Sequence, residues 1–185
     1  MNNATKAVNG KPFLSDIKTL RDRARLHIEK GAVTAGYKAE RETVIKVLNE
    51  ALATEIVCVL RYKRHQFMAH GIEAQSVAAE FAQHALEEQA HVDLLAERIV
   101  QLGGAPDFSP AGLATRSHSE YAEGKDLAEM IEEDIIAERI AIDNYGEMIR
   151  YIGNDDPTTR VRLEGILAKE EEHADDLSSL LKENK

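Results

Sequence analysis

Four long stretches of the 185-residue chain carry apolar residues at alternating steps of three and four, which constrains the fold more than any other feature of the sequence. This spacing puts one apolar stripe along the face of an α-helix. We find no strand-like alternation, so the sequence predicts an all-α protein. The expected helices cover about 38–70, 76–102, 126–152 and 157–181, with glycine after the first three and Asp-Pro, a typical helix start, before the fourth.

The connections between these helices predict a four-helix bundle with one long crossover. The first and third turns are short, so each joins two antiparallel neighbours. The middle connection, between Gly104 and Asp126, has about 21 residues, which reach at most ~70 Å when extended. A helix of about 26 residues is ~40 Å long, so this connection can cross the whole bundle. The expected order of directions is up-down-down-up.

The first 37 residues are expected to form an arm that precedes the bundle of residues 38–185. Residues 1–12 are expected to be disordered, and a short helix is expected from a Ser15 cap to about Lys30, where Gly31 stops it. Its apolar stripe must be covered by the bundle or by a neighbouring subunit, and it comprises Phe13, Leu14, Ile17, Leu20, Leu26 and Ile28.

The composition predicts a cytoplasmic protein with no membrane segment. No apolar run approaches the ~20 residues of a membrane span, the N-terminus has no apolar signal core, and Cys58 is the single cysteine. Residues 1–47 hold ten Lys and Arg against five Asp and Glu, whereas residues 48–185 hold thirteen against twenty-eight. An acidic body, suited to attracting cations, therefore follows a mildly basic arm.

Glutamates and histidines interrupt the apolar stripe near the middle of each long helix. The first and third helices each carry one such glutamate, and the second and fourth each carry a Glu-x-x-His motif. A step of three residues keeps both side chains of a motif on one helix face. Six side chains can therefore meet at one level of the bundle: Glu55, Glu88, His91, Glu138, Glu170 and His173.

Four carboxylates at this level predict bound metal. Each would cost several kcal/mol to bury without a partner, and the stripes offer no Lys or Arg at these positions. Two divalent ions balance the four charges while both imidazoles bind as neutral ligands. A ligand set without thiolates disfavours structural zinc and suits iron or manganese.

With these residues the sequence resembles the bacterioferritins and the bacterioferritin-like Dps-type mini-ferritins, from about Leu48 to Leu181. Leu48-Asn49 before Glu55, and Tyr62 after it, fit that family. The most specific part is Glu88-x-x-His91-x-Asp93-x-x-x-Glu97-Arg98-Ile99, followed by Leu102-Gly103-Gly104-Ala105-Pro106. The resemblance implies a ferritin-like fold and a ferroxidase that oxidises Fe(II) with O2 or H2O2, for iron storage, detoxification and protection from oxidative stress.

The same resemblance implies a role for each site residue. Tyr62 would be a redox-active tyrosine near the metals or, equally, a core tyrosine with a hydrogen-bonded hydroxyl. Two iron ions per subunit are implied, with manganese or zinc as substitutes. Glu88 and Glu170 would bridge the metals, Glu55 and Glu138 would be terminal ligands, and His91 and His173 would each bind one metal.

Two departures from the bacterioferritin pattern bear on haem and on assembly. Bacterioferritins bind haem through a methionine directly after the second-helix glutamate, and Gln89 stands there, so haem is not expected. The sequence also runs only twelve residues beyond His173, which leaves no room for the fifth helix of that family. Together with the N-terminal extension, these features favour a homo-oligomeric shell of twelve subunits over one of twenty-four.

Two other classes of function remain open on the sequence. One is a different dimetal enzyme, such as a peroxidase, an oxygenase or a manganese catalase. The other is a DNA-coating or structural shell protein with a structural metal site, which the basic arm permits and the acidic body disfavours. His84 and Asp134, each one turn before a predicted ligand, are either partners of the ligands, part of a route for iron, or satisfied polar core groups.

Overall fold

The computed structural model describes residues 7–8, 11–12, 14–71 and 74–183, and it divides into two units, Met1–Lys38 and Ala39–Lys185. In the first unit, β1 (Ala7–Val8) pairs antiparallel with β2 (Lys11–Pro12), a short pairing that the expectation of disorder missed. The rest of that expectation, residues 1–6 and 9–10, lies outside the described residues.

The helix expected from Ser15 to Lys30 is shorter than the sequence suggested. It runs as α1 (Ile17–Ala24), and its cap is Asp16, whose carboxylate accepts a 2.9 Å hydrogen bond from the Thr19 amide. His27 adopts a left-handed backbone with φ 54°, which interrupts the helix before the 3-10 turn η1 (Ile28–Lys30). The apolar side chains of this arm are exposed, apart from Phe13, which lies outside the described residues: Leu14, Ile17, Leu20, Leu26 and Ile28.

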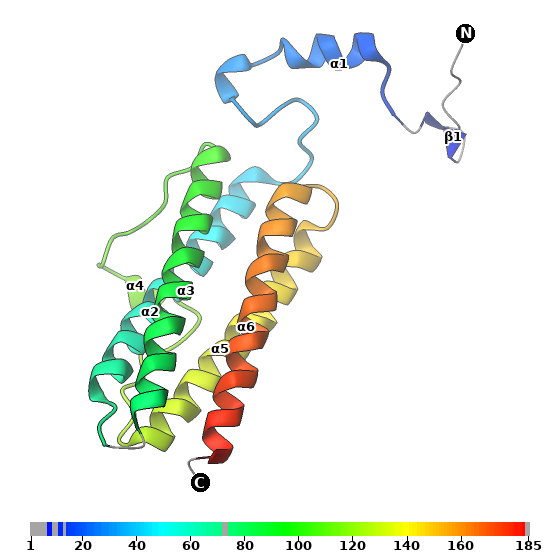
Figure 1. Ribbon diagram of the computed structural model, residues 1–185. Helices are drawn as coiled ribbons and strands as arrows, with labels where there is room; N and C mark the ends of the chain where they lie inside the picture. The colour runs from blue at the N-terminus through cyan, green and yellow to red at the C-terminus, as the bar shows by residue number, and fades with distance from the viewer. Residues whose placement is uncertain (1–6, 9–10, 13, 72–73, 184–185) are drawn as a thin grey trace. The chain divides into compact units, whose positions relative to one another are not determined.

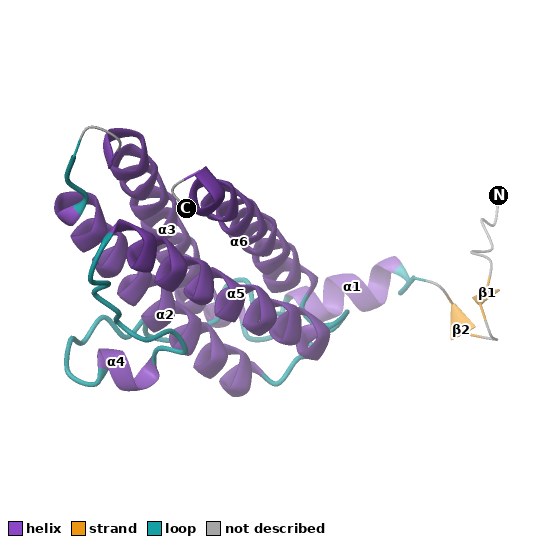
Figure 2. Ribbon diagram, turned by 90° about the horizontal axis from the view of Figure 1, so that it is seen from below, coloured by secondary structure: helices purple, strands orange, loops and turns teal. Residues whose placement is uncertain are grey.

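The second unit is the predicted four-helix bundle. Its long helices are α2 (Arg41–Met68), α3 (Ala74–Gln101), α5 (Leu127–Ile152) and α6 (Pro157–Glu183), and α4 (Leu113–Arg116) is one short turn inside the crossover. Helix α2 packs mainly against α3, and α5 mainly against α6. The crossover runs along the bundle from the end of α3 to the start of α5, which confirms the up-down-down-up order (Figure 1; Figure 2). None of the described helices is long and apolar enough to span a membrane.

Local sequence explains where the helices start and stop. Asp126 and Asp156 cap α5 and α6, because each carboxylate accepts a 2.9 Å hydrogen bond from the amide three residues later. Gly103 ends α3 with φ 77°, and the Gly104 amide donates to the Ile99 carbonyl. A Cβ on Gly104 would lie 2.8 Å from the Ile45 side chain, so the Gly-Gly pair also lets this turn approach α2 closely.

The predicted stripes form the core. Leu48, Phe81, Leu95 and Ile131 are fully buried. In α6 the pattern shifts slightly, because Ile166 is buried where Leu167 was expected. Half-buried positions of the predicted stripes are Val59, Leu127, Leu167, Ala174 and Leu181.

Polar side chains of α2 fasten the crossover to the bundle along its length. The Asn49 side chain bonds to the backbone of residues 105 and 107, and the Thr54 hydroxyl accepts from the amide of residue 118. Further along, Arg61 donates to the carbonyl of residue 120, and His65 contacts that of residue 122. These bonds satisfy backbone groups that the irregular chain would otherwise leave unpaired beside the core.

Candidate dimetal site

The structure brings all six predicted ligands together in the middle of the bundle. Each of its four long helices contributes, and the side chains form two groups whose potential ligand atoms lie within 4.8 Å of one another. Five of the six residues are about 1% exposed and His91 is 8% exposed, so the site is closed to bulk water. The two groups are Glu55, Glu88, His91 and Glu170, and Glu88, Glu138, Glu170 and His173.

Glu88 and Glu170 belong to both groups, as bridging carboxylates would. The His91 Nδ1 atom lies 2.9 Å from Glu170 Oε1 and 3.2 Å from Glu88 Oε2. The His173 Nδ1 atom lies 3.2 Å from Glu88 Oε1 and 3.8 Å from Glu170 Oε2. Each of the two shared carboxylates therefore faces one histidine on either side.

The terminal carboxylates complete the two groups from opposite helices. Glu55 on α2 lies 3.6 Å from His91 Nδ1, and Glu138 on α5 lies 3.8 Å from His173 Nδ1. Each group thus holds three carboxylates and one imidazole. This donor set suits Fe(II) or Mn(II).

The site also holds buried polar atoms that protein groups do not satisfy. Glu88 Oε1, Glu170 Oε1 and His173 Nδ1 are buried, and their nearest partners within the site, at 2.9 to 3.2 Å, lie outside hydrogen-bond geometry. In the described part of the chain, no Lys or Arg forms a salt bridge with Glu55, Glu88, Glu138 or Glu170. Buried donor atoms of this kind are rare unless a ligand satisfies them, so the residues present fit two divalent ions.

Two tyrosines hold the terminal glutamates in the same way. The Tyr62 hydroxyl of α2 donates a short hydrogen bond to Glu138 of α5, and the Tyr145 hydroxyl of α5 donates one to Glu55 of α2. Both tyrosines are buried. The family resemblance points only to Tyr62, yet Tyr145 follows Glu138 by the same seven residues that separate Tyr62 from Glu55.

Glu87 orients His173, although its backbone lies off the apolar stripe. Its Oε2 atom lies 2.7 Å from His173 Nε2, so it accepts the N–H of that nitrogen and leaves Nδ1 to face the carboxylates. Such a carboxylate fixes the tautomer of a metal-binding histidine and raises its basicity.

Crowding sets the protonation of the carboxyl groups in the absence of metal. Burial, followed by the charge of Glu88, raises the pKa of Glu55 to about 8. Burial and the neighbouring glutamates likewise raise the pKa of Glu170. Burial would raise the pKa of Glu88 and Glu138 as well, but contacts with neighbouring side chains of the site, including His173, lower both. A carboxyl group with a pKa of about 8, as at Glu55, keeps its proton at neutral pH, and the pKa of Glu170 shifts in the same direction.

The pKa of each of the two histidines is raised, whereas burial alone would lower the pKa of an imidazole. Burial alone lowers the pKa of His91, but its contacts with Glu55 and Glu88 outweigh burial and raise the pKa to about 10. Contacts with Glu138 and Glu88 do the same for His173, also to about 10. Both rings are therefore protonated at neutral pH until a metal displaces the proton.

A buried ion-pair cluster lies one turn from the site. Arg61 Nε and His65 Nδ1 each lie 2.8 Å from a different oxygen of Asp134. Asp134 is therefore a satisfied polar core group. No signal in the sequence pointed to His65, and Arg61 is a buried cation that we did not expect among the stripes.

His84 lies beside Tyr62 and His173. Its Nδ1 atom is 3.3 Å from the Tyr62 hydroxyl, and its ring stacks on His173 with 4.0 Å between centroids. Burial, followed by the charge of His173, lowers the pKa of His84. His84 is thus a direct neighbour of a predicted ligand.

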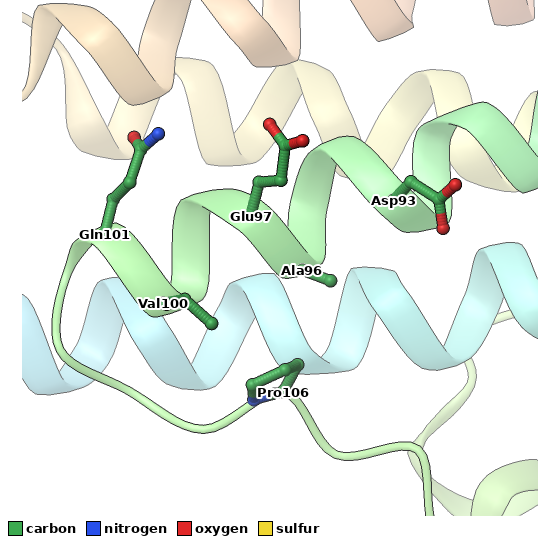
Figure 3. Close-up of a pocket in the computed structure, with 6 residues that line it drawn as sticks. All are labelled: Asp93, Ala96, Glu97, Val100, Gln101 and Pro106. Carbon is green, nitrogen blue, oxygen red and sulfur yellow. The ribbon is translucent and has the colours of Figure 1, made fainter.

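A surface pocket lies elsewhere, on the outer side of α3 (Figure 3). It is lined by Asp93, Glu97 and Pro106 of the family motif, together with Ala96, Val100 and Gln101. The motif therefore shapes a surface as well as the buried site.

Comparison with known proteins places the chain in a family. Residues 45–185 match the profile of the ferritin-like domain. A nutrient stress-induced DNA-binding protein of Synechococcus is 34% identical over 130 residues, which cover 69% of this chain and 74% of that protein.

Two solved structures are similar over most of their length. A dodecameric thioferritin, the bacterioferritin-related protein of Bacteroides fragilis, has a TM-score of 0.76 and 31% identity, and the match covers 79% of this chain and 88% of that one. A ferritin-like, diiron-carboxylate protein of Bacillus anthracis has a TM-score of 0.68 and 29% identity, with 77% and 99% covered. Bacterioferritins and Dps proteins are among the other similar chains, which confirms the resemblance drawn from the sequence. The chain belongs to the ferritin-like domain family.

Proposed function

We propose that this protein is a cytoplasmic ferroxidase that binds two Fe(II) ions per subunit and oxidises them with O2 or H2O2. The observation that carries the proposal is the pair of four-residue groups that share Glu88 and Glu170. A shared carboxylate pair holds two ions close enough to act together. The similarity to a protein described as a diiron-carboxylate protein supports the same choice of metal.

The reaction needs two electrons from two substrates held side by side. Two Fe(II) supply two electrons to one H2O2, which takes up two protons and leaves as two waters, or to one O2, which with two protons leaves as H2O2. Carboxylates suit both iron charge states, because they can bind through one oxygen or two. Pairing the electrons in this way avoids release of a one-electron radical.

The surrounding side chains position the ligands and exclude water. Tyr62 and Tyr145 fix the terminal glutamates, and Glu87 fixes the ring of His173. The site is buried in the core of the bundle, and all four of its glutamates are about 1% exposed. Rigid, dry placement of this kind lowers the reorganisation needed during oxidation.

We propose a twelve-subunit shell as the assembled form. The Bacteroides relative, 31% identical, is described as dodecameric. The bundle of this chain exposes large apolar side chains that subunit contacts would cover, among them Leu86 at 64%, Val100 at 59% and Tyr151 at 58%. Light scattering should give a mass near twelve times 20.6 kDa, whereas a stable monomer or dimer at micromolar concentration would rule the shell out.

DNA binding is a second candidate because the Synechococcus relative is described as a DNA-binding protein. In this chain the excess of Lys and Arg lies within residues 1–47, ahead of an acidic body. A gel-shift titration at low salt, with and without the first 37 residues, tests this candidate. Binding that weakens with salt and depends on the arm supports it.

The ferroxidase proposal is tested by stopped-flow oxidation of Fe(II) under O2 and under H2O2. Glu88→Gln and Glu170→Gln should lose rapid oxidation, whereas Glu171→Gln, at an exposed neighbour, should oxidise normally. Circular dichroism controls for folding. Wild-type rates in both ligand variants would contradict the proposal. Oxidation that stops at two irons per chain would favour a cofactor-retaining enzyme over iron storage.

A further inference from the structure

A third group of potential ligands lies beside the dimetal site, on the same two helices. Glu80 and His84 precede Glu88 on α3 at four-residue steps, and Asp176 follows His173 on α6 by three residues. One ligand atom from each of Glu80, His84 and Asp176 lies within 4.8 Å of the other two. The ligand rows of α3 and α6 thus continue beyond the dimetal site.

Hydrogen bonding fixes which nitrogen of His84 faces this group. The single hydroxyl hydrogen of Tyr62 is donated to Glu138, so the Tyr62 oxygen can only accept from His84 Nδ1, at 3.3 Å. In a neutral His84 ring the lone pair is therefore on Nε2. That atom lies 3.3 Å from Glu80 Oε1.

An imidazole lone pair that faces two carboxylates forms a donor set suited to a divalent cation. The Nε2 atom makes no hydrogen bond to another described residue, and the His84 side chain is only 2% exposed. The carboxylates of Glu80 and Asp176 bring two negative charges, which one divalent ion balances with a neutral imidazole. Ligand atoms within 4.8 Å of one another are close to the spacing around one ion with bonds of about 2.1 Å.

Exposure falls steadily along this group toward the dimetal site. Asp176 is exposed and the Glu80 side chain is 37% exposed, whereas His84 is buried. The His84 ring then stacks on His173, at 4.0 Å between centroids and 22° between planes. An ion held at this group is therefore open to solvent on one side and adjacent to a ligand of the dimetal site on the other.

We propose that Glu80, His84 and Asp176 form a third divalent-cation site, through which Fe(II) reaches the metal position of Glu138 and His173. The binding site stands on its own geometry, and its role in delivery rests on the proposed ferroxidase function. The carboxylates of Glu80 and Asp176, on the solvent-exposed side of this group, raise the local concentration of hydrated cations. The buried imidazole replaces part of their hydration water next to the final position.

Co(II) is the probe for binding because it resists oxidation by O2. Anomalous diffraction from crystals of the full chain soaked in Co(II) should show three peaks per subunit, one of them among Glu80, His84 and Asp176. The double variant Glu80→Gln/Asp176→Asn should keep the two central peaks and lose the third. The control Asp175→Asn changes an exposed neighbour and should keep all three.

Delivery is tested by stopped flow at limiting Fe(II). The double variant should show an initial oxidation rate lower by roughly ten-fold, because electrostatic focusing of ions changes on-rates by about that much or more, and the Asp175→Asn control should match wild type. Two full central peaks without a third in the wild-type crystal would overturn the site, and an unchanged rate in the double variant would overturn its role in delivery. Absence of central peaks or of any Fe(II) oxidation by wild type would instead overturn the proposed function.

Discussion

Loading the dimetal site should expel about four protons per chain. In the absence of metal, Glu55, with a pKa of about 8, keeps its proton at pH 7, and burial among the other glutamates raises the pKa of Glu170 in the same direction. His91 and His173, each with a pKa of about 10, are protonated as well. Two divalent ions bring four positive charges, so the loss of four protons leaves the charge of this buried site unchanged.

The magnitude follows from the proton count. Each proton displaced changes the apparent association constant ten-fold per pH unit. Four protons therefore change the constant for the metal pair by about 10,000-fold per pH unit, or ~100-fold per metal. The raised pKa values fix the sign of the pH dependence. The groups hold their protons at pH values below their pKa, so the affinity for metal must rise as pH rises toward 8. Below pH 6 the site should load poorly.

Calorimetry with Co(II) measures this release directly. Titrations at pH 7 in two buffers with different ionisation enthalpies give the number of protons, and a series from pH 6 to pH 8 gives the slope. Glu170→Gln should release fewer protons, and Glu171→Gln should match wild type. Release of one proton or fewer per chain, or an affinity that is flat over this range, would refute the charge-balance reasoning.

Three further predictions concern the supporting side chains and the fold. Tyr62→Phe and Tyr145→Phe remove the hydrogen bonds to Glu138 and Glu55, so each should weaken Co(II) binding at one position by roughly 10- to 100-fold. Calorimetry measures these affinities, and unchanged values would show that the tyrosines only fill space. Asp156→Ala removes the cap of α6 and both 2.9 Å bonds to buried Arg98, which should lower the free energy of unfolding by about 3–5 kcal/mol. Urea unfolding of the metal-free protein measures this, and Asp155→Ala, at an exposed neighbour, should change the free energy little. Because the pKa of Asp156 is lowered, its contribution is present above pH 4 and lost as pH falls further, so the difference between wild type and variant should shrink at pH 3. Finally, Co(II) at one hundred times its Kd should stabilise the wild-type chain by about 2.7 kcal/mol per site, seen as a higher Tm, and Glu170→Gln should lose most of that gain.

The sequence predicted the fold correctly where helix-capping residues and the apolar stripe indicate the same helix. Asp156-Pro157 and the glycines Gly103 and Gly153 marked helix ends to within two or three residues, because caps and positive φ angles depend on one or two residues. The arm was harder, since α1 has no buried residue and local propensity alone sets its length. The left-handed conformation of His27 had no signal in the sequence.

The sequence predicted which six side chains would meet in the core, but not the residues that surround them. Glutamate in an apolar stripe is conspicuous, because burial makes it costly. Glu87 gave no such signal, since its backbone lies off the stripe and only its long side chain reaches His173. The cluster of Arg61, His65 and Asp134 joins residues about 70 positions apart, and such pairs depend on how the two hairpins dock.

The ligands are divided evenly between two helical hairpins. Helices α2 and α3 supply Glu55, Glu88 and His91, and α5 and α6 supply Glu138, Glu170 and His173. Each hairpin packs mainly within itself, so the carboxylates occupy the seam between the hairpins, where repulsion would otherwise separate them. The tyrosine of each hairpin holds the terminal glutamate of the other, and the bridging glutamates contact histidines from both. Neither hairpin can therefore build one complete group alone, and two divalent ions would join the halves of the bundle as well as carry its chemistry.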